Sequence, residues 1–248
     1  MSPLNVGDTF LIRSDVLHET RRINVYRPAA YADSPQGLPV LYMPDGGLAE
    51  DFLHIAGLLQ VSAGNGTMRP FLLVGIENTQ RRRDLTGPTE SADDKKIAAQ
   101  VGGSEAFRRF IRSELMPAIR SRYRTTPETA IIGESLAGLF VVETFFLESD
   151  LFDSYVAIDP SLWWNGARLV REATGRLAGG LPRPKALYLA ASRDDRDRRT
   201  EQLAGVLRRG APSNLTWFYD AMPEEGHATI YHPAALRAFR RLFGSPSR

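Results

Sequence analysis

The segment Thr129–Val142 constrains the fold of this chain more than any other stretch. The apolar residues Thr129–Ile132 lead through Gly133-Glu-Ser135-Leu-Ala137-Gly into a second apolar run. Small residues around a serine let a strand and a helix approach closely at a sharp turn. The segment therefore predicts a strand, a strained turn with the serine at its apex, and a helix that begins at once.

Ser135 is the predicted nucleophile, because this turn presents a hydroxyl at a helix N-terminus. There the backbone N–H of Leu136 can stabilise a developing oxyanion. Ala137 stands where the pattern usually has a second glycine, and alanine is small enough to fit. The alternative is an ordinary serine that caps a helix.

Short β-rich runs alternate with longer runs of helical period along the chain. The first two runs alternate apolar with polar residues, as an antiparallel pair at a sheet edge does. The later ones are nearly continuous apolar runs, typical of strands that are covered on both faces. The predicted strands are Thr9–Ser14, Arg21–Arg27, Val40–Met43, Phe71–Ile76, Thr129–Ile132, Tyr155–Ile158, Ala186–Ala190 and Leu215–Tyr219.

Amphipathic segments lie between these strands. The predicted helices are Ala49–Val61, Ser104–Tyr123, Leu136–Glu148, Ala167–Ala178, Arg199–Arg209 and Pro233–Phe243. Strand–helix alternation predicts an α/β fold, with a mostly parallel eight-stranded sheet and helices on both faces. Pro and Gly punctuate the connections without isolating a second unit, so residues 1–248 are predicted to form a single domain.

Composition excludes several classes of function. The chain has no cysteine, so it has no disulfide, thiolate nucleophile or cysteine-based metal site. Its 31 basic and 29 acidic residues give a net charge of +2, which does not favour a nucleic-acid partner. No apolar run approaches the roughly 20 residues of a membrane span, and residues 1–10 lack the apolar core of a signal peptide. We therefore expect no membrane partner and a cytoplasmic protein.

A reactive serine needs a base, and the chain offers four histidines. His18 and His54 come too early for the order Ser…Asp…His. His227 lies between the last predicted strand and the last predicted helix, where a base of this kind is expected, and it is the predicted base. His232, before Pro233, is interpreted as a structural residue or as a residue of the pocket wall.

The predicted acid follows the penultimate strand, since an acid between serine and histidine orients the imidazole. Asp194 is the first carboxylate beyond Ala186–Ala190 and is preferred over Asp195 and Asp197. The alternative is a solvated acidic loop. A second oxyanion donor is expected after the third strand, where Gly47 can turn its backbone N–H toward the site. A plain turn is the alternative there.

Several motifs, in order along nearly the whole chain, resemble those of the putative esterase family of the α/β-hydrolase superfamily, which includes enterochelin-type siderophore esterases and esterase D-like enzymes. They are Leu-Tyr-Met-Pro-Asp-Gly-Gly, Arg83-Asp-Leu-Thr, Gly103-Ser-Glu-Ala-Phe, Ile-Gly-Glu-Ser-Leu-Ala-Gly-Leu-Phe, Asp-Pro-Ser161-Leu-Trp-Trp and Gly226-His-Ala…His-Pro. The resemblance implies the α/β-hydrolase fold, with Ser135 as nucleophile, His227 as base, and Gly47 and Leu136 at the oxyanion hole. Some siderophore esterases in this family resemble enzymes that work with a serine–histidine pair alone; the carboxylate of Asp194 favours a full triad.

The resemblance also implies that Arg83, Trp163 and Trp164 lie at the active-site edge. Together they can bind an aromatic or anionic acyl group by cation–π contact and stacking. Equally, Arg83 can pair with Asp84 to hold its loop while a tryptophan covers the core. Glu134, beside the nucleophile, is assigned no role.

The leading hypothesis is a serine carboxylic-ester hydrolase that forms an acyl-enzyme on Ser135, acting on siderophore lactones or aromatic esters. An acyltransferase is the near alternative, and a catalytically silent binding module is the alternative from another class. The expected partner is a small-molecule ester. No metal or organic cofactor is called for, and the oligomeric state is left open.

Overall fold

The computed structural model describes residue 1 and residues 4–245, and it centres on one eight-stranded sheet. The strand order is β1-β2-β4-β3-β5-β6-β7-β8. β2 runs antiparallel to both of its neighbours, and all other adjacent pairs are parallel. The strands are β1 (Gly7–Ser14), β2 (Glu19–Tyr26), β3 (Leu38–Pro44), β4 (Leu72–Ile76), β5 (Thr125–Glu134), β6 (Ser154–Ile158), β7 (Lys185–Ser192) and β8 (Leu215–Met222).

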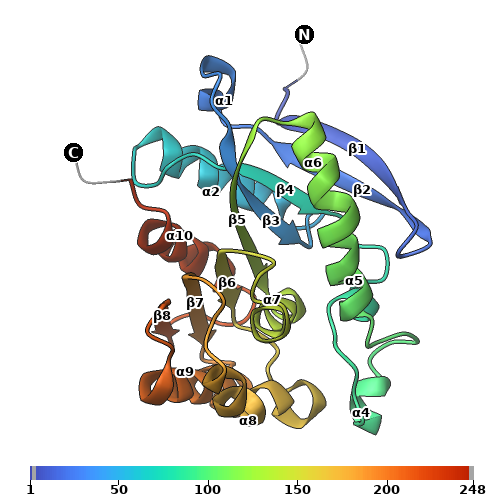
Figure 1. Cartoon of the computed structure of the whole chain (residues 1–248), viewed down its shortest axis with the longest axis vertical. Coiled ribbons are helices and arrows are strands. Elements are labelled where there is room, and N and C mark those ends of the chain that lie inside the picture. Colours follow the sequence, from blue (N-terminus) through green and yellow to red (C-terminus); the bar gives the residue numbers. More distant parts are fainter. Residues whose placement is uncertain (2–3, 246–248) are drawn as a thin grey trace.

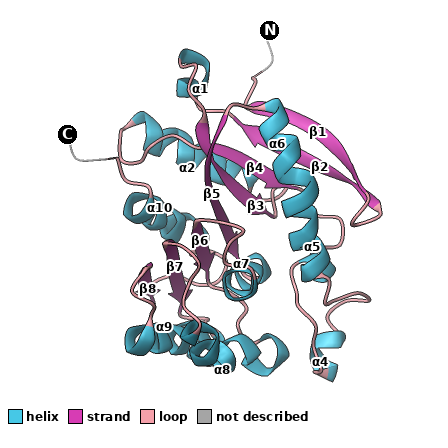
Figure 2. Ribbon diagram, viewed as in Figure 1, coloured by secondary structure: helices cyan, strands magenta, loops and turns pink. Residues whose placement is uncertain are grey.

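Helices cover both faces of the twisted sheet, with α2 and α10 on one face and the remaining long helices on the other (Figures 1 and 2). The long helices are α2 (Phe52–Gly64), α5 (Ser104–Phe110), α6 (Met116–Arg122), α7 (Leu136–Leu147), α8 (Trp164–Ala178), α9 (Arg199–Gly210) and α10 (Tyr231–Leu242). The predicted mostly parallel sheet with helices on both faces is confirmed.

Alternation along the central strands explains the two-sided packing. Tyr42 and Ile131 point into the core beneath α5–α8, whereas Leu41 and Ile132 point into the core beneath α2 and α10. All four side chains are buried. Successive residues of a strand face opposite sides, so a strand covered on both faces needs a continuous apolar run.

The predicted helix Ser104–Tyr123 is interrupted by one π-helical turn, Ile111–Leu115 (η1), which joins α5 to α6. The N–H of Met116 donates to the carbonyl of Ile111, five residues back. Pro117 follows directly, and a proline has no N–H and clashes with the preceding helical turn. The wider turn accommodates that proline without ending the helix.

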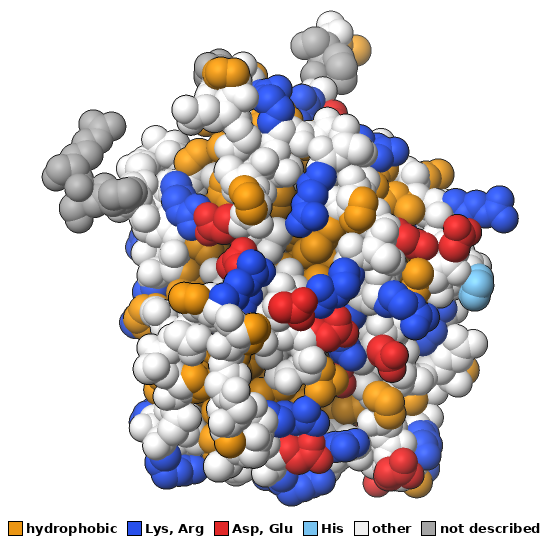
Figure 3. Space-filling model, viewed as in Figure 1, with side chains coloured by type: hydrophobic (Ala, Val, Ile, Leu, Met, Phe, Trp, Pro, Cys, Tyr) orange, Lys and Arg blue, Asp and Glu red, His pale blue; other side chains and the backbone are white. Residues whose placement is uncertain are grey.

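Four short helical segments were not predicted, because each is too short to carry a helical period. They are α1 (Ala29–Asp33), α3 (Arg81–Asp84), α4 (Ala92–Lys95) and the 3₁₀ turn η2 (Arg196–Arg198). Within the described part of the chain, no helix has the length and apolar character that crossing a bilayer requires. Basic and acidic side chains intermingle on the face drawn in Figure 3, consistent with the near-balanced charge.

Candidate active site

Ser135 lies at the turn between β5 and α7, where the sequence predicts it. Its backbone has φ 59° and ψ −120°, a strained conformation for a residue with a side chain. A Cβ at Gly133 would lie 2.7 Å from the Cβ of Ala137, so only glycine allows the strand and helix to approach this closely. The carbonyl of Ile158 accepts the N–H of Ser135 at 3.1 Å and ties the turn to β6.

His227 reaches the serine from the loop between β8 and α10, as predicted. Its Nε2 lies 3.0 Å from Ser135 Oγ, and its Nδ1 lies 2.6 Å from Oδ2 of Asp159. The imidazole side chain is 47% exposed, whereas that of Asp159 is only 3% exposed. Serine, histidine and acid therefore form one continuous hydrogen-bonded chain that opens to solvent at the histidine.

Asp159 is held ionised by its partners. It directly follows β6, and its carboxylate accepts hydrogen bonds from the backbone N–H and the hydroxyl of Ser192 at 2.9 and 2.8 Å. Burial acts to raise the pKa of Asp159, but the hydrogen bonds from His227 and Ser192 outweigh it and lower that pKa. In turn, the hydrogen bond to Asp159 raises the pKa of His227, against the effect of partial burial.

The structure places Asp194, the predicted acid, at the backbone of His227: its Oδ2 accepts the backbone N–H at 2.9 Å, and it makes no hydrogen bond to the imidazole nitrogens. Asp195 instead accepts hydrogen bonds from Thr200 at the start of α9, and Asp197 pairs with Arg199 at 3.3 Å. The carboxylate that contacts the imidazole directly follows β6, whereas Asp194 follows β7. β6 and β7 are adjacent in the sheet, so carboxylates that follow either strand lie at neighbouring positions on the same edge.

Asp159 is absent from the residues predicted above, although a signal for it existed. It directly follows a buried apolar strand and begins the Asp-Pro-Ser161 motif. Asp159 also adopts φ 43°, so its backbone is turned in the left-handed region. An acid that directly ends a parallel strand lies at the same sheet edge as the nucleophile, and that rule would have included it.

The two predicted oxyanion donors differ in the structure. Leu136 begins α7, and among the described residues its N–H has no hydrogen-bond acceptor. The N–H of Gly47 donates to Oε2 of Glu50 at 2.6 Å, and that of Gly46 donates to the carbonyl of Ile76. Gly47 is therefore not a free donor here, because its N–H is already hydrogen-bonded to the Glu50 carboxylate.

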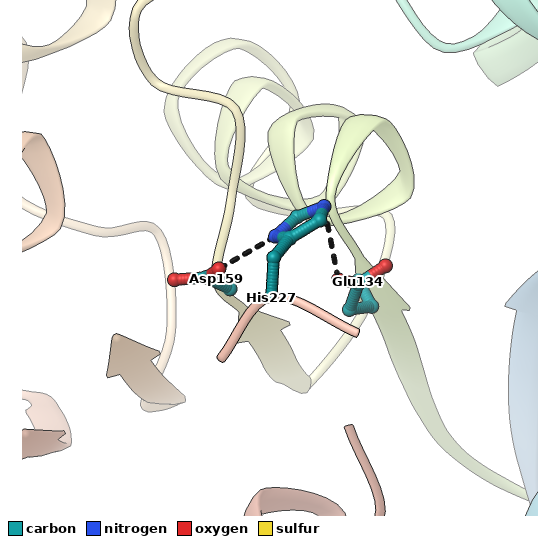
Figure 4. Close-up of side chains that lie close together, drawn as sticks. All are labelled: Glu134, Asp159 and His227. Carbon is teal, nitrogen blue, oxygen red and sulfur yellow. Dashed lines mark hydrogen bonds and ion pairs between the residues drawn. The ribbon is translucent and has the colours of Figure 1, made fainter. Parts of the chain in front are cut away.

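Glu134 is a third group at His227. Its Oε1 lies 3.3 Å from His227 Nε2 (Figure 4). The same nitrogen faces Ser135 Oγ. The ligand atoms of Glu134, Asp159 and His227 lie within 4.8 Å of one another, a spacing that can hold a cation. A neutral imidazole that donates from Nδ1 to Asp159 and accepts at Nε2 from Ser135 has no lone pair left for a metal. Acid–base chemistry accounts for this arrangement.

Of the predicted substrate residues, only Trp163 lines the small hollow beside His227. This hollow, of about 50 Å³, is bounded by Asp159–Ser161, Trp163, Asp194–Arg196 and His227. The guanidinium carbon of Arg196 lies 5.6 Å from the centroid of the Trp163 ring. Trp163 and Arg196 form what we call the aromatic rim of the site. Two larger hollows, of about 850 and 870 Å³, are lined by other residues and include neither Ser135 nor His227.

The other three predicted substrate residues have structural partners. Trp164 is buried and donates its indole N–H to the carbonyl of Gly87 at 2.9 Å. Arg83 pairs with Asp84 and Glu19, and His232 lies 2.9 Å from His54 between facing ring nitrogens. None of these three side chains lines the hollow at His227, so their role in substrate binding stays a prediction.

The chain is similar to known proteins over most of its length. The family model described as "Putative esterase" matches residues 14–199. The ferri-bacillibactin esterase BesA of Bacillus subtilis is 27% identical over 252 residues, which cover 90% of this chain and 84% of that protein. The siderophore triacetylfusarinine C esterase of Aspergillus fumigatus is 30% identical over 184 residues, covering 69% of this chain and 61% of that protein.

Solved structures show the same fold. An IroE-like serine hydrolase from Shewanella oneidensis superposes with a TM-score of 0.86 at 29% identity, covering 96% of this chain and 80% of the other. The BES protein from Bacillus cereus superposes with a TM-score of 0.85 at 20% identity, covering 100% and 98%. The predicted α/β-hydrolase fold is confirmed.

Proposed function

We propose that this chain, which belongs to the "Putative esterase" family and is a carboxylic ester hydrolase, cleaves siderophore esters through an acyl-enzyme on Ser135. The continuous chain from Ser135 Oγ through His227 to Asp159, with contacts of 3.0 and 2.6 Å, carries this proposal. A serine is unreactive without an adjacent base, and this base has its own orienting carboxylate.

Acylation begins when Ser135 Oγ attacks the ester carbonyl carbon while its proton passes to His227 Nε2. The carbonyl electron pair moves to oxygen, where the N–H of Leu136 at the start of α7 stabilises the negative charge. The imidazolium then gives its proton to the leaving alcohol as the tetrahedral intermediate collapses. Asp159 stays ionised and stabilises the imidazolium through Nδ1.

Hydrolysis follows when water attacks the acyl-enzyme and His227 accepts its proton. The half-exposed imidazole is open to water, which favours hydrolysis over transfer to a second alcohol. A binding module without activity would have no need for a strained serine and a complete proton path, so both features support a working enzyme.

Siderophore esters are the proposed substrates for two reasons. The matched relatives are named as siderophore esterases. In addition, the aromatic rim of Trp163 and Arg196 stands beside the acid–base pair and offers stacking and a positive charge. The hollow there is small, so most of a bulky substrate lies on the open surface outside it.

A test compares wild type, Ser135→Ala and the matched control Ser121→Ala on chromogenic acetate and aryl esters and on a triscatecholate siderophore lactone. Ser121 is an exposed serine at the end of α6. We expect the Ser135 variant to lose essentially all activity and the control to keep it. Labelling by a fluorophosphonate, located by mass spectrometry, is expected on Ser135 alone. Activity of Ser135→Ala equal to wild type would disprove the mechanism, and cleavage of simple esters without the lactone would disprove the substrate class.

A further inference from the structure

The Nε2 atom of His227 faces two oxygens rather than one. Ser135 Oγ lies at 3.0 Å and Glu134 Oε1 lies at 3.3 Å. That Glu134 oxygen is shielded from solvent and has no hydrogen-bond partner within the described part of the chain. A buried polar atom without a partner is costly, and such atoms concentrate at functional sites.

We propose that Glu134 is a positioning residue that acts through His227: its carboxylate shares the Nε2 proton with Ser135 and stabilises the imidazolium formed during attack. This inference rests on the proposed serine mechanism. It adds a second acid, on the opposite ring nitrogen from Asp159.

The groups around Glu134 leave His227 as the cation best placed to pair with it. Arg81, from α3, makes a two-pronged ion pair with Asp45 at 2.7 and 2.8 Å. Among the other neighbours, Asp45 and Asp159 are negative, and Tyr231 of α10 carries a neutral, buried hydroxyl. Burial raises the pKa of Glu134 to about 7, and its neighbour His227 acts to lower it.

Three carboxylates lie around His227. The imidazole contacts Asp159 through Nδ1 and Glu134 through Nε2. The third carboxylate, Asp194, accepts the backbone N–H of His227. Catalysis requires a neutral His227 imidazole beside an ionised Glu134 carboxylate. Below neutral pH, this pair carries one additional proton. Held on Nε2, that proton blocks the base; held on the Glu134 carboxyl, it can be donated to Nε2 in place of the Ser135 hydroxyl. Such a pair titrates as a unit.

When Ser135 attacks, its proton moves to Nε2 and no bond to Glu134 forms or breaks. A carboxylate at this position attracts the new N–H and favours the charged transition state. The same attraction makes the resting imidazole harder to deprotonate. Glu134 therefore raises the rate at high pH and shifts the acidic limb of the pH–rate profile to higher pH.

The test is kcat/KM from pH 5 to 9 for an uncharged acetate ester, with wild type, Glu134→Gln and the control Glu224→Gln. Glu224 lies in the same loop as His227, and its exposed carboxylate pairs with Arg237 of α10. We expect the acidic limb of Glu134→Gln to move to lower pH. Since two unit charges about 4 Å apart change an equilibrium by about fivefold in a water-like medium, the high-pH plateau falls by about that factor. The control profile is expected to match wild type.

A Glu134→Gln profile identical to wild type would overturn the inference while leaving the serine mechanism intact. Activity of Ser135→Ala would instead overturn the proposed function itself. Should Glu134→Gln fail to fold, an NMR titration of the His227 ring in wild type decides between the two outcomes. A two-step curve for the ring supports the coupled pair, and a single step contradicts it.

Discussion

Two charged clusters on this molecule use similar side chains in opposite ways. The first, here called the Arg21 network, consists of Arg21, Glu19, Asp84 and Arg83. Arg21 is fully buried and pairs with Glu19 at 2.6 Å and with Asp84, and Arg83 closes the ring to the same two acids at 3.0 and 2.7 Å. Two positive charges thus meet two negative ones, and the cluster is neutral at the pH of the cell.

The second cluster, the catalytic corner, consists of Ser135, His227, Asp159 and Glu134. Two carboxylates face one imidazole that is half exposed, and one Glu134 oxygen makes no hydrogen bond among the described residues. Balance and burial fix a cluster in one charge state, whereas imbalance and partial exposure bring its titration near neutral pH. The first arrangement holds the fold and the second can move protons.

The largest effect is expected within the catalytic corner. Asp159→Asn removes the charge that stabilises the imidazolium and disfavours the required tautomer, so kcat is expected to fall by about 10³- to 10⁴-fold. The matched control is Asp194→Asn: within the described part of the chain the Asp194 carboxylate hydrogen-bonds to the backbone N–H of His227 and not to the imidazole, so a loss of less than about tenfold is expected. Steady-state kinetics on a chromogenic ester measure both. If Asp194→Asn lost as much as Asp159→Asn, the acid would belong after β7 and the corner described here would be misassigned.

The Arg21 network should respond in stability and not in catalysis. Arg21→Met leaves Glu19 and Asp84 without their buried partner, and breaking such a pair lowers the free energy of unfolding by about 3–5 kcal/mol. Arg22→Met is the control: Arg22 is exposed and pairs weakly with Glu77 at 3.6 Å, so a change within about 0.5 kcal/mol is expected. Urea unfolding measures both, and kcat/KM per folded molecule should match wild type. A loss of kcat/KM in folded Arg21→Met would erase the distinction between the two clusters.

Most of the fold could be predicted because it rests on local patterns. All eight predicted strands and the six long helical stretches occur, since apolar runs and amphipathic periods report burial directly. The turn at Ser135 and the loop position of His227 were predictable for the same reason. Each is set by residues next to it in the chain.

The rest depends on contacts between residues far apart in sequence. Asp159 and Asp194 both follow buried parallel strands, and only the lateral geometry of β6 and β7 decides which carboxylate reaches Nδ1. Likewise, the motif around Arg83 predicted a substrate contact, but its partner Glu19 comes from β2, some sixty residues away. A single sequence carries no direct record of such pairings.

A smaller effect tests whether the catalytic corner costs stability, as its imbalance implies. Burial raises the pKa of Glu134 to about 7, so the folded state holds a proton that the unfolded state has released. Stability from this group is therefore present below its ordinary pKa and is lost as pH rises toward 7. Glu134→Gln removes that loss, so its free energy of unfolding at pH 8 should be about 1–2 kcal/mol higher than that of wild type. At pH 5 the two proteins should differ little. Urea titrations at both pH values measure it, and equal stability at pH 8 would mean that the carboxylate carries no net cost.

The smallest expected effect concerns the aromatic rim, where the corner meets substrate. Arg196→Gln removes the positive charge 5.6 Å from the Trp163 ring. An exposed attraction between this charge and an anionic aryl ester contributes up to about 1 kcal/mol, so its loss is expected to raise the KM for that ester by up to about fivefold. Arg198→Gln is the matched control, since Arg198 is 77% exposed in the same segment, pairs with Glu201 and does not line the hollow at His227. Because neither arginine touches the proton path, kcat and the KM for acetate esters should stay unchanged in both variants. A matching rise in KM for Arg198→Gln would mean that the loop attracts anions by its overall charge, and the recognition assigned to the rim would then extend over the whole Arg193–Arg199 segment.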